Sequence, residues 1–172
     1  MEKSDDLDDI RRRAPLHFWA KADNARYCAW CLWNLITSEG PQDPNVIGYR
    51  GDTDIALSEG WQRERSLALE CIIKAAFARR ERGMPVPATH DVSRLWDAAK
   101  LPKVGKDDRI RLVLTAQVLQ WSGRYAAPIE GSDGQRSPLA QLTRRRGSVF
   151  THQPKFGWGE FDSLYQRAVS AI

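Results

Sequence analysis

The feature that most constrains the fold is a set of apolar residues that recur every three or four positions, most clearly between residues 59 and 82. Residues at this spacing lie on one face of an α-helix. Arginines at the end of this stretch suit the helix dipole, and Gly83 is a typical stop signal. We therefore predict a helix over about 59–82, with Ser58 as its N-cap. Its stripe consists of Trp61, Leu67, Ala68, Cys71, Ile72, Ala75 and Ala76.

The same spacing predicts four further helices. One covers about residues 15–37, with Pro15 in its first turn and an apolar stripe. A short helix runs from Thr89 or Asp91 to Lys100, another from Asp107 or Asp108 to the residue before Gly123, and a last one covers about 161–172. No segment alternates as a strand would. The expected fold class is all-α, an antiparallel up-and-down bundle of four to five helices. The stripe of helix 15–37 consists of Phe18, Ala22, Ala25, Ala29, Leu32 and Ile36.

The chain length predicts one domain. A chain of 172 residues is long enough to build a single core. Residues 1–13 are polar and are expected to form an N-terminal tail, and residues 14–172 to form the domain. Residues 126–157 contain several Gly and Pro breakers and no long apolar stripe, so they are expected to be a long irregular insertion before the last helix.

Cysteine usage indicates a cytoplasmic protein. The three cysteines are an odd number, and no apolar leader precedes them, which disfavours a secreted disulfide framework. Cys28 and Cys31 form a Cys-x-x-Cys spacing, but neither a preceding strand nor a second pair accompanies it. We interpret Tyr27–Trp33 as an apolar helix face. No metal, no cofactor and no membrane association are expected, since the sequence has no metal-ligand spacing beyond this lone Cys-x-x-Cys, no phosphate-binding glycine loop and no long apolar run.

Charge is unevenly distributed along the chain, whose formal net charge is +4. The first nine residues carry five acids and one lysine, whereas Arg136–Lys155 carries five basic residues and no acid. A basic segment of this kind suits a phosphate-bearing partner such as RNA. The alternative is a solvated loop without a partner.

Several short motifs occur in an order that resembles the HEPN family. Glu70 and Lys74 lie four residues apart, and Gly83, then Pro87-Ala-Thr-His-Asp91, then Arg124-Tyr125 with Pro128 follow them. The resemblance covers residues 16–36, 61–128 and, more weakly, 158–172. It implies a helical bundle that often forms a homodimer and often acts on RNA or a bound nucleotide.

The resemblance also implies a possible ribonuclease centre. Many members of the family carry an Arg, four to six residues, and then a His near their last helices. The His would move the 2′-hydroxyl proton, and the Arg would stabilise the developing phosphate charge. No His follows Arg124 at this spacing, but Arg146 and His152 match it, with Arg144 and Arg145 beside them. The catalytic candidates are therefore Arg146 and His152, with Arg124, Arg144 and Arg145 as ligand-binding candidates.

Glu70, Lys74 and His90 are further candidates for ligand binding. His90 lies at an expected helix start, where free N–H groups attract anions, or it caps that helix by bonding to the backbone. Glu70 and Lys74 at i,i+4 form either an ordinary surface pair or a buried polar site. The sequence leaves both alternatives open.

The expected function is that of a HEPN-like protein in RNA or nucleotide biology. We predict a non-catalytic binding module, or the partner of a nucleotidyltransferase or antitoxin in a toxin–antitoxin or defence system. The displaced motif keeps a metal-independent ribonuclease toxin as an alternative. A second alternative is a dimeric interaction scaffold that pairs through its tryptophan-rich faces, since the chain has seven tryptophans.

Overall fold

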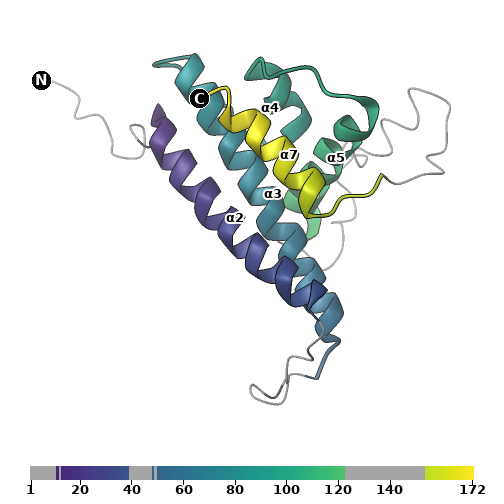
Figure 1. The fold of residues 1–172 in the computed structure, drawn as a ribbon. Coiled ribbons are helices and arrows are strands. Elements are labelled where there is room, and N and C mark those ends of the chain that lie inside the picture. Colours follow the sequence, from purple (N-terminus) through teal and green to yellow (C-terminus); the bar gives the residue numbers. More distant parts are fainter. Residues whose placement is uncertain (1–10, 12, 39–47, 49, 123–153) are drawn as a thin grey trace, which may run out of the picture.

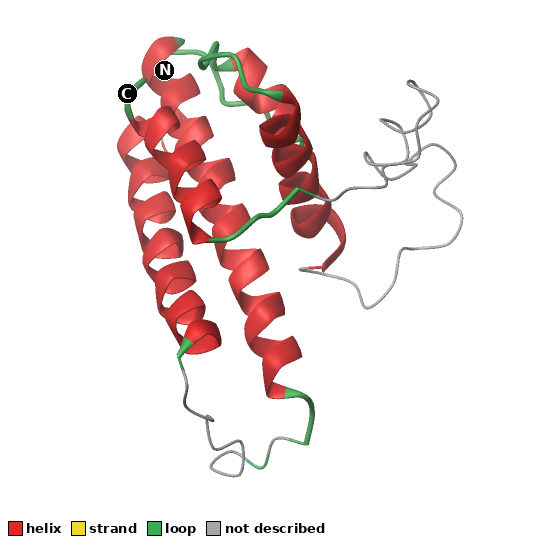
Figure 2. Ribbon diagram, turned by 45° about the vertical axis from the view of Figure 1, so that its right-hand side comes forward, coloured by secondary structure: helices red, strands yellow, loops and turns green. Residues whose placement is uncertain are grey.

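The computed structural model describes residues 11, 13–38, 48, 50–122 and 154–172. Every regular element in these ranges is helical (Figures 1 and 2). The elements are α2 (Pro15–Thr37), α3 (Thr53–Arg80), α4 (Val92–Ala98), α5 (Lys106–Gln117), a π-helical turn η2 (Val118–Ser122) and α7 (Trp158–Val169). The predicted all-α class is confirmed.

Helices α2 and α3 run antiparallel along each other, and α7 lies beside both of them (Figures 1 and 2). The buried residues of α2 are all alanines, namely Ala22, Ala25 and Ala29. Small side chains let two helix backbones approach closely, so α2 packs on α3 through this seam with little bulk between them. The larger residues of α2 are left at the margins of the seam.

The middle of α3 forms the centre of the core. Leu69, Ile72 and Ile73 are fully buried. They lie in one cluster with Leu95 and Trp96 of α4 and with the inward side of α7. Since α3 is covered by α2, α4, α5 and α7, its middle turns are buried on more than one face. The α7 residues of the cluster are Phe161, Leu164, Tyr165 and Ala168.

The helix bounds agree with the sequence prediction for α2 and differ for α3. Helix α3 begins at Thr53, because the side chain of Asp52 accepts hydrogen bonds from the backbone N–H groups of Asp54 and Ile55. The predicted N-cap, Ser58, therefore lies inside the helix. Leu67 was predicted to belong to the buried stripe, and that prediction is wrong because its side chain is 38% exposed.

The starts of α4 and α7 are explained by local hydrogen bonds. Asp91 is the N-cap of α4 and accepts from the N–H of Arg94 at 3.0 Å. Helix α7 starts at Trp158, earlier than expected, and the carboxylate of Glu160 accepts from the N–H of Gly157 at 2.9 Å. This bond fixes the position of Trp158 at the first turn of the helix. Residues 126–153 of the expected insertion, and residues 1–10 and 12 of the expected tail, lie outside the described residues.

Within the described ranges, no helix combines the length and the apolar character that crossing a bilayer requires.

Candidate functional site

Glu70, Lys74 and His90 form a polar cluster in which Glu70 is buried and the His90 side chain is partly exposed. Glu70 lies on α3 and is 4% exposed. One of its carboxylate oxygens accepts from Lys74 Nζ at 2.5 Å, and the other lies 2.8 Å from His90 Nδ1. The structure thus brings together three of the residues that the sequence singled out. The surface-pair alternative for Glu70 and Lys74 is wrong, since Glu70 is buried.

This cluster joins α3 to the segment that enters α4. His90 contacts the Glu70 side chain, whereas the cap of α4 is Asp91, so the expectation that His90 caps the helix is wrong. A buried carboxylate needs partners of this kind, because an isolated charge in the interior costs several kcal/mol or more. The cluster is therefore satisfied internally, and its chemistry is that of a cross-link between two elements.

The other candidate site residues do not fall in the described part of the chain. Arg124, Arg144, Arg145, Arg146 and His152 all lie outside it. Among the described residues, no group of three or more His, Cys, Asp or Glu side chains is placed to hold a metal ion.

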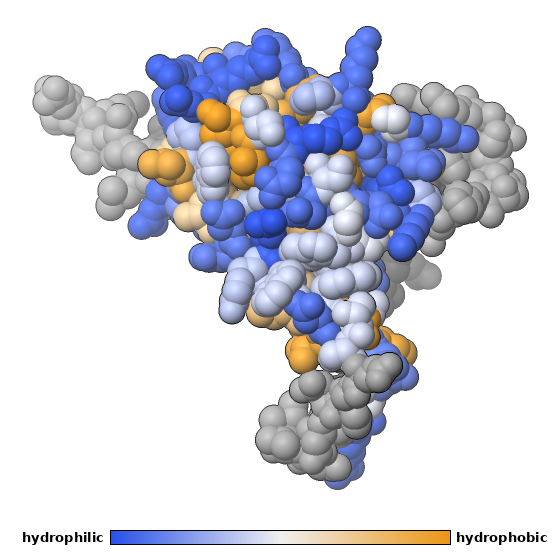
Figure 3. Space-filling model, in the orientation of Figure 1, coloured by the Kyte–Doolittle hydropathy of each residue, from blue (hydrophilic) through white to orange (hydrophobic). Residues whose placement is uncertain are grey.

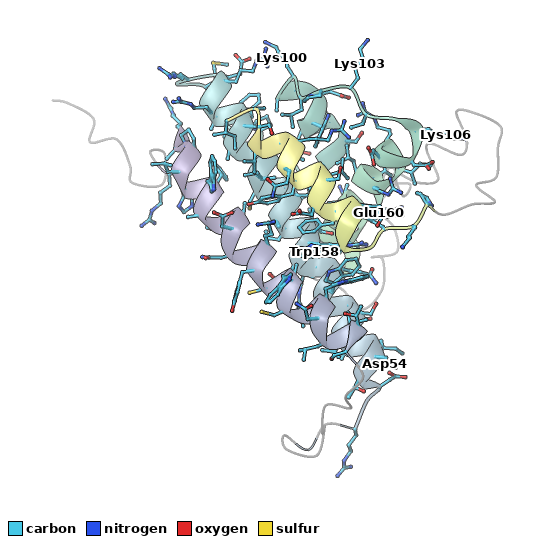
Figure 4. All side chains as sticks on the ribbon, in the orientation of Figure 1. Asp54, Lys100, Lys103, Lys106, Trp158 and Glu160 are labelled. Atoms are coloured by element: carbon cyan, nitrogen blue, oxygen red, sulfur yellow. The ribbon has the colours of Figure 1, made fainter. Side chains whose placement is uncertain are left out.

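A second site, which sequence reasoning missed, is an open pocket between α2 and the start of α7. It has a volume of about 560 Å³, within the range of small-molecule sites. We call it the aromatic pocket. Figure 4 labels Trp158 at the start of α7, the element that closes one side of it. The pocket is lined by Asp23, Arg26, Tyr27, Trp30 and Trp158.

The aromatic rings of this pocket are presented to solvent. Tyr27 and Trp30 are stacked, with ring centroids 6.2 Å apart and planes at 29°. Their side chains are 66% and 47% exposed. Large aromatic side chains usually pack in the core or in an interface, so two exposed rings side by side are unusual. Such rings can stack on a planar ligand. On the face that Figure 3 shows, the described apolar residues form small separate groups rather than one broad patch.

The charged residues of the pocket are held in fixed positions. Arg26 donates from Nε and Nη2 to Asp162 at 3.0 and 2.7 Å. Its guanidinium lies 5.8 Å from the ring centroid of Trp158 and 5.0 Å from that of Tyr165. Arg26 therefore ties α2 to α7 and supports the tryptophan that lines the pocket.

Asp23 accepts from two donors, one on each carboxylate oxygen. Tyr165 donates its hydroxyl to Oδ1 at 2.6 Å, and Trp19 donates its indole N–H to Oδ2 at 2.9 Å. Burial and the hydrogen bond to Asp23 raise the pKa of Tyr165 well above its usual range. The tyrosine therefore stays protonated and donates to the carboxylate at any physiological pH.

The interpretation of Tyr27–Trp33 as an apolar helix face is wrong for its exposed members. Cys28 is exposed, like Tyr27 and Trp30. A usable signal was present, because Asp23, Tyr27 and Trp30 follow i, i+4, i+7 spacing on the side away from the alanine seam. The contribution of Trp158 has no local signal, since it depends on how α7 packs.

Arg65 is, with Glu70, a buried charged residue, and it lies between two rings. Its guanidinium carbon is 4.0 Å from the ring centroid of Trp61 and 3.8 Å from that of Phe156. Nη1 donates to the carbonyl oxygen of Phe156 at 2.5 Å. Burial lowers the pKa of Arg65 to about 9. The side chain connects α3 to the segment that leads into α7, and so helps to position Trp158 of the aromatic pocket.

Comparison of the chain with protein-family models, with curated proteins and with solved structures finds no match.

The three cysteines are expected to differ strongly in reactivity. Burial raises the pKa of the Cys71 thiol to about 11, whereas Cys28 is exposed. Since the thiolate is the reacting form, iodoacetamide at pH 8 should alkylate Cys28 first and Cys71 only after unfolding. Peptide mapping by mass spectrometry over time measures this, with urea-unfolded protein as the control. Alkylation of Cys71 at the rate of Cys28 in the native protein would contradict its burial.

Proposed function

We propose that this protein is a HEPN-like helical module that binds single-stranded RNA or nucleotides without acting on them catalytically. The observation that carries the proposal is the aromatic pocket, in which the stacked rings of Tyr27 and Trp30 are exposed to solvent and Trp158 also lines the space. Each exposed ring offers a surface on which a base can stack, and such a contact contributes roughly 1–3 kcal/mol per base.

The rest of the molecule is consistent with binding by stacking. The pocket volume of about 560 Å³ accommodates a base with part of its sugar. The net charge of +4 favours approach of a polyanion, while the pocket itself holds one carboxylate and one paired arginine. A base that stacks in the pocket while its phosphate points to solvent agrees with the positive net charge of the chain and with the carboxylate in the pocket.

The biological setting in this proposal comes from the resemblance alone. Glu70, Lys74 and His90 carry the resemblance, and their cluster supports the fold around the core rather than a reaction. We extend the proposal to a homodimer that works with a nucleotidyltransferase or an antitoxin. Sedimentation analysis of the purified chain tests the dimer separately from ligand binding.

Replacing Trp30 with alanine is expected to weaken RNA binding. Loss of one stacking contact of about 1–3 kcal/mol corresponds to a decrease in affinity of roughly 5- to 150-fold. Fluorescence anisotropy with a labelled single-stranded RNA of mixed sequence at low salt measures the change. Binding should also weaken as salt is raised, because phosphate contacts are screened.

Leu67→Ala is the matched control for this measurement. Leu67 is an exposed apolar residue of α3 that does not line the pocket, so its removal should leave RNA affinity unchanged. If wild-type protein does not bind RNA at low salt, or if Trp30→Ala and Leu67→Ala bind equally well, the proposed function is wrong.

A further inference from the structure

The carboxylate of Asp23 retains hydrogen-bonding capacity on both of its oxygens. An ionised carboxylate offers about four acceptor positions, two on each oxygen. The tyrosine hydroxyl of Tyr165 uses one on Oδ1, and the indole N–H of Trp19 uses one on Oδ2. One position on each oxygen is left, on an exposed residue that lines the aromatic pocket. The two donors fix the orientation of this pair.

The negative charge of Asp23 is not neutralised by the arginine next to it in the pocket. Arg26 makes its ion pair with Asp162, at 2.7 Å. The two neighbours that do contact Asp23 are a hydroxyl and an indole, which are neutral donors. A ligand that stacks on Tyr27 or Trp30 in this pocket therefore shares it with a carboxylate that has one acceptor position left on each oxygen.

Among the four RNA bases, guanine alone offers two adjacent N–H donors on one edge. Its ring N1–H and exocyclic N2–H groups point in the same direction and match the two oxygens of a carboxylate. Adenine and cytosine place a ring acceptor next to their amino group, and uracil places its N3–H between two carbonyl oxygens. A carboxylate repels these acceptors, so it discriminates among bases that stack equally well.

We propose that the aromatic pocket is a guanine-binding site, in which the base stacks on the Tyr27–Trp30 pair and donates N1–H and N2–H to Asp23. This inference rests on the proposed function and adds base selectivity to it. Stacking supplies affinity for any base, and Asp23 supplies the preference. The phosphate of the nucleotide lies outside the pocket, away from the carboxylate.

The decisive experiment compares nucleotides on the unaltered chain of 172 residues. Quenching of tryptophan fluorescence, with calorimetry as the second method, gives the dissociation constants of GMP, IMP, AMP, CMP and UMP. GMP should bind about ten-fold or more tightly than AMP, CMP or UMP, as expected for a bidentate contact. IMP lacks the exocyclic amino group, so it should bind several-fold more weakly than GMP.

Asp23→Asn gives the corresponding test on the protein. The amide replaces one acceptor with a donor, so the preference for GMP over AMP should be lost while stacking persists. Glu59→Gln is the matched control, because Glu59 is an exposed acid of α3 that does not line the pocket. This control should retain the full preference for GMP. If Asp23→Asn does not fold, the comparison of GMP with IMP on wild-type protein decides.

The results separate this inference from the proposed function. Equal binding of all five nucleotides, with RNA binding that still depends on Trp30, would overturn guanine selectivity and leave the proposed function standing. No binding of RNA or of any nucleotide would overturn both. If arginine amide binds the pocket more tightly than GMP does, the site prefers cationic guanidinium groups and the guanine assignment is wrong.

Discussion

Glu70→Leu is expected to lower the free energy of unfolding by about 3–5 kcal/mol, because it leaves a mostly buried lysine without its carboxylate. The Lys74 side chain is 13% exposed and donates to Glu70 at 2.5 Å. Leucine fills most of the vacated volume but accepts no hydrogen bond, and His90 loses its contact as well. Urea denaturation followed by circular dichroism measures the loss, and the melting temperature should fall by roughly 10 °C.

Two further variants show whether the effect arises from the unpaired charge. Glu59→Leu removes an exposed acid from the same helix and should change stability by less than about 0.5 kcal/mol. The double variant Glu70→Leu, Lys74→Met removes both charges and should recover most of the loss. If Glu70→Leu costs no more than Glu59→Leu, the polar cluster does not stabilise the fold.

The same cluster shows what the sequence could and could not predict. The i,i+4 spacing of Glu70 and Lys74 was visible, and so was the position of His90 near a helix start. The burial of Glu70 and the near-burial of Lys74 were not visible, because they follow from the packing of other helices around the middle of α3. A sequence pattern describes one helix at a time, whereas the number of covered faces is a property of the assembled bundle.

The start of α3 could not be chosen from the sequence for an energetic reason. Asp52 and Ser58 are both good N-cap residues, and their intrinsic preferences are closely similar. The helix begins directly after its N-cap, Asp52. Ser58 lies inside the helix, where its hydroxyl accepts a hydrogen bond from the side chain of Gln62 at 3.2 Å. The bounds of α2, by contrast, were predicted well, since Pro15 marks its first turn clearly.

The aromatic pocket was missed because aromatic residues are buried in most contexts. Tryptophan and tyrosine within an apolar stretch usually pack against other side chains. Trp33 follows that rule, because its ring packs against Trp61 with a distance of 4.8 Å between the ring centroids. Tyr27 and Trp30 do not, because the alanines on the opposite side of α2 form the seam with α3. Since the alanines face α3, Tyr27 and Trp30 lie on another side of α2, where they line the pocket together with Trp158 at the start of α7.

Arg65→Ala is expected to destabilise the protein by about 3 kcal/mol, because truncation removes the packing of a buried side chain against two rings and leaves a cavity between them. The cation–π contact and the charge-assisted hydrogen bond add to this loss, and the cost of burying the charge offsets much of their contribution. Trp61, Phe156 and the Phe156 carbonyl all lose their partner. Arg65→Lys should lose about half as much, because an ammonium group does not stack as a planar guanidinium does. Urea denaturation measures both changes.

The opposing contribution is the cost of burying the Arg65 charge. Its pKa is about 9 in the folded protein, lower than the ordinary value of 12.5, so the charge opposes folding fully below pH 9. Arg65→Met keeps an apolar side chain without this cost and separates the two effects. We expect it to be less stable than wild type, because the ring contacts and the Phe156 bond outweigh desolvation. Arg63→Lys, an exposed position two residues away, is the control and should be neutral. If Arg65→Met is more stable than wild type, burial of the charge dominates and Arg65 does not hold α3 to the start of α7.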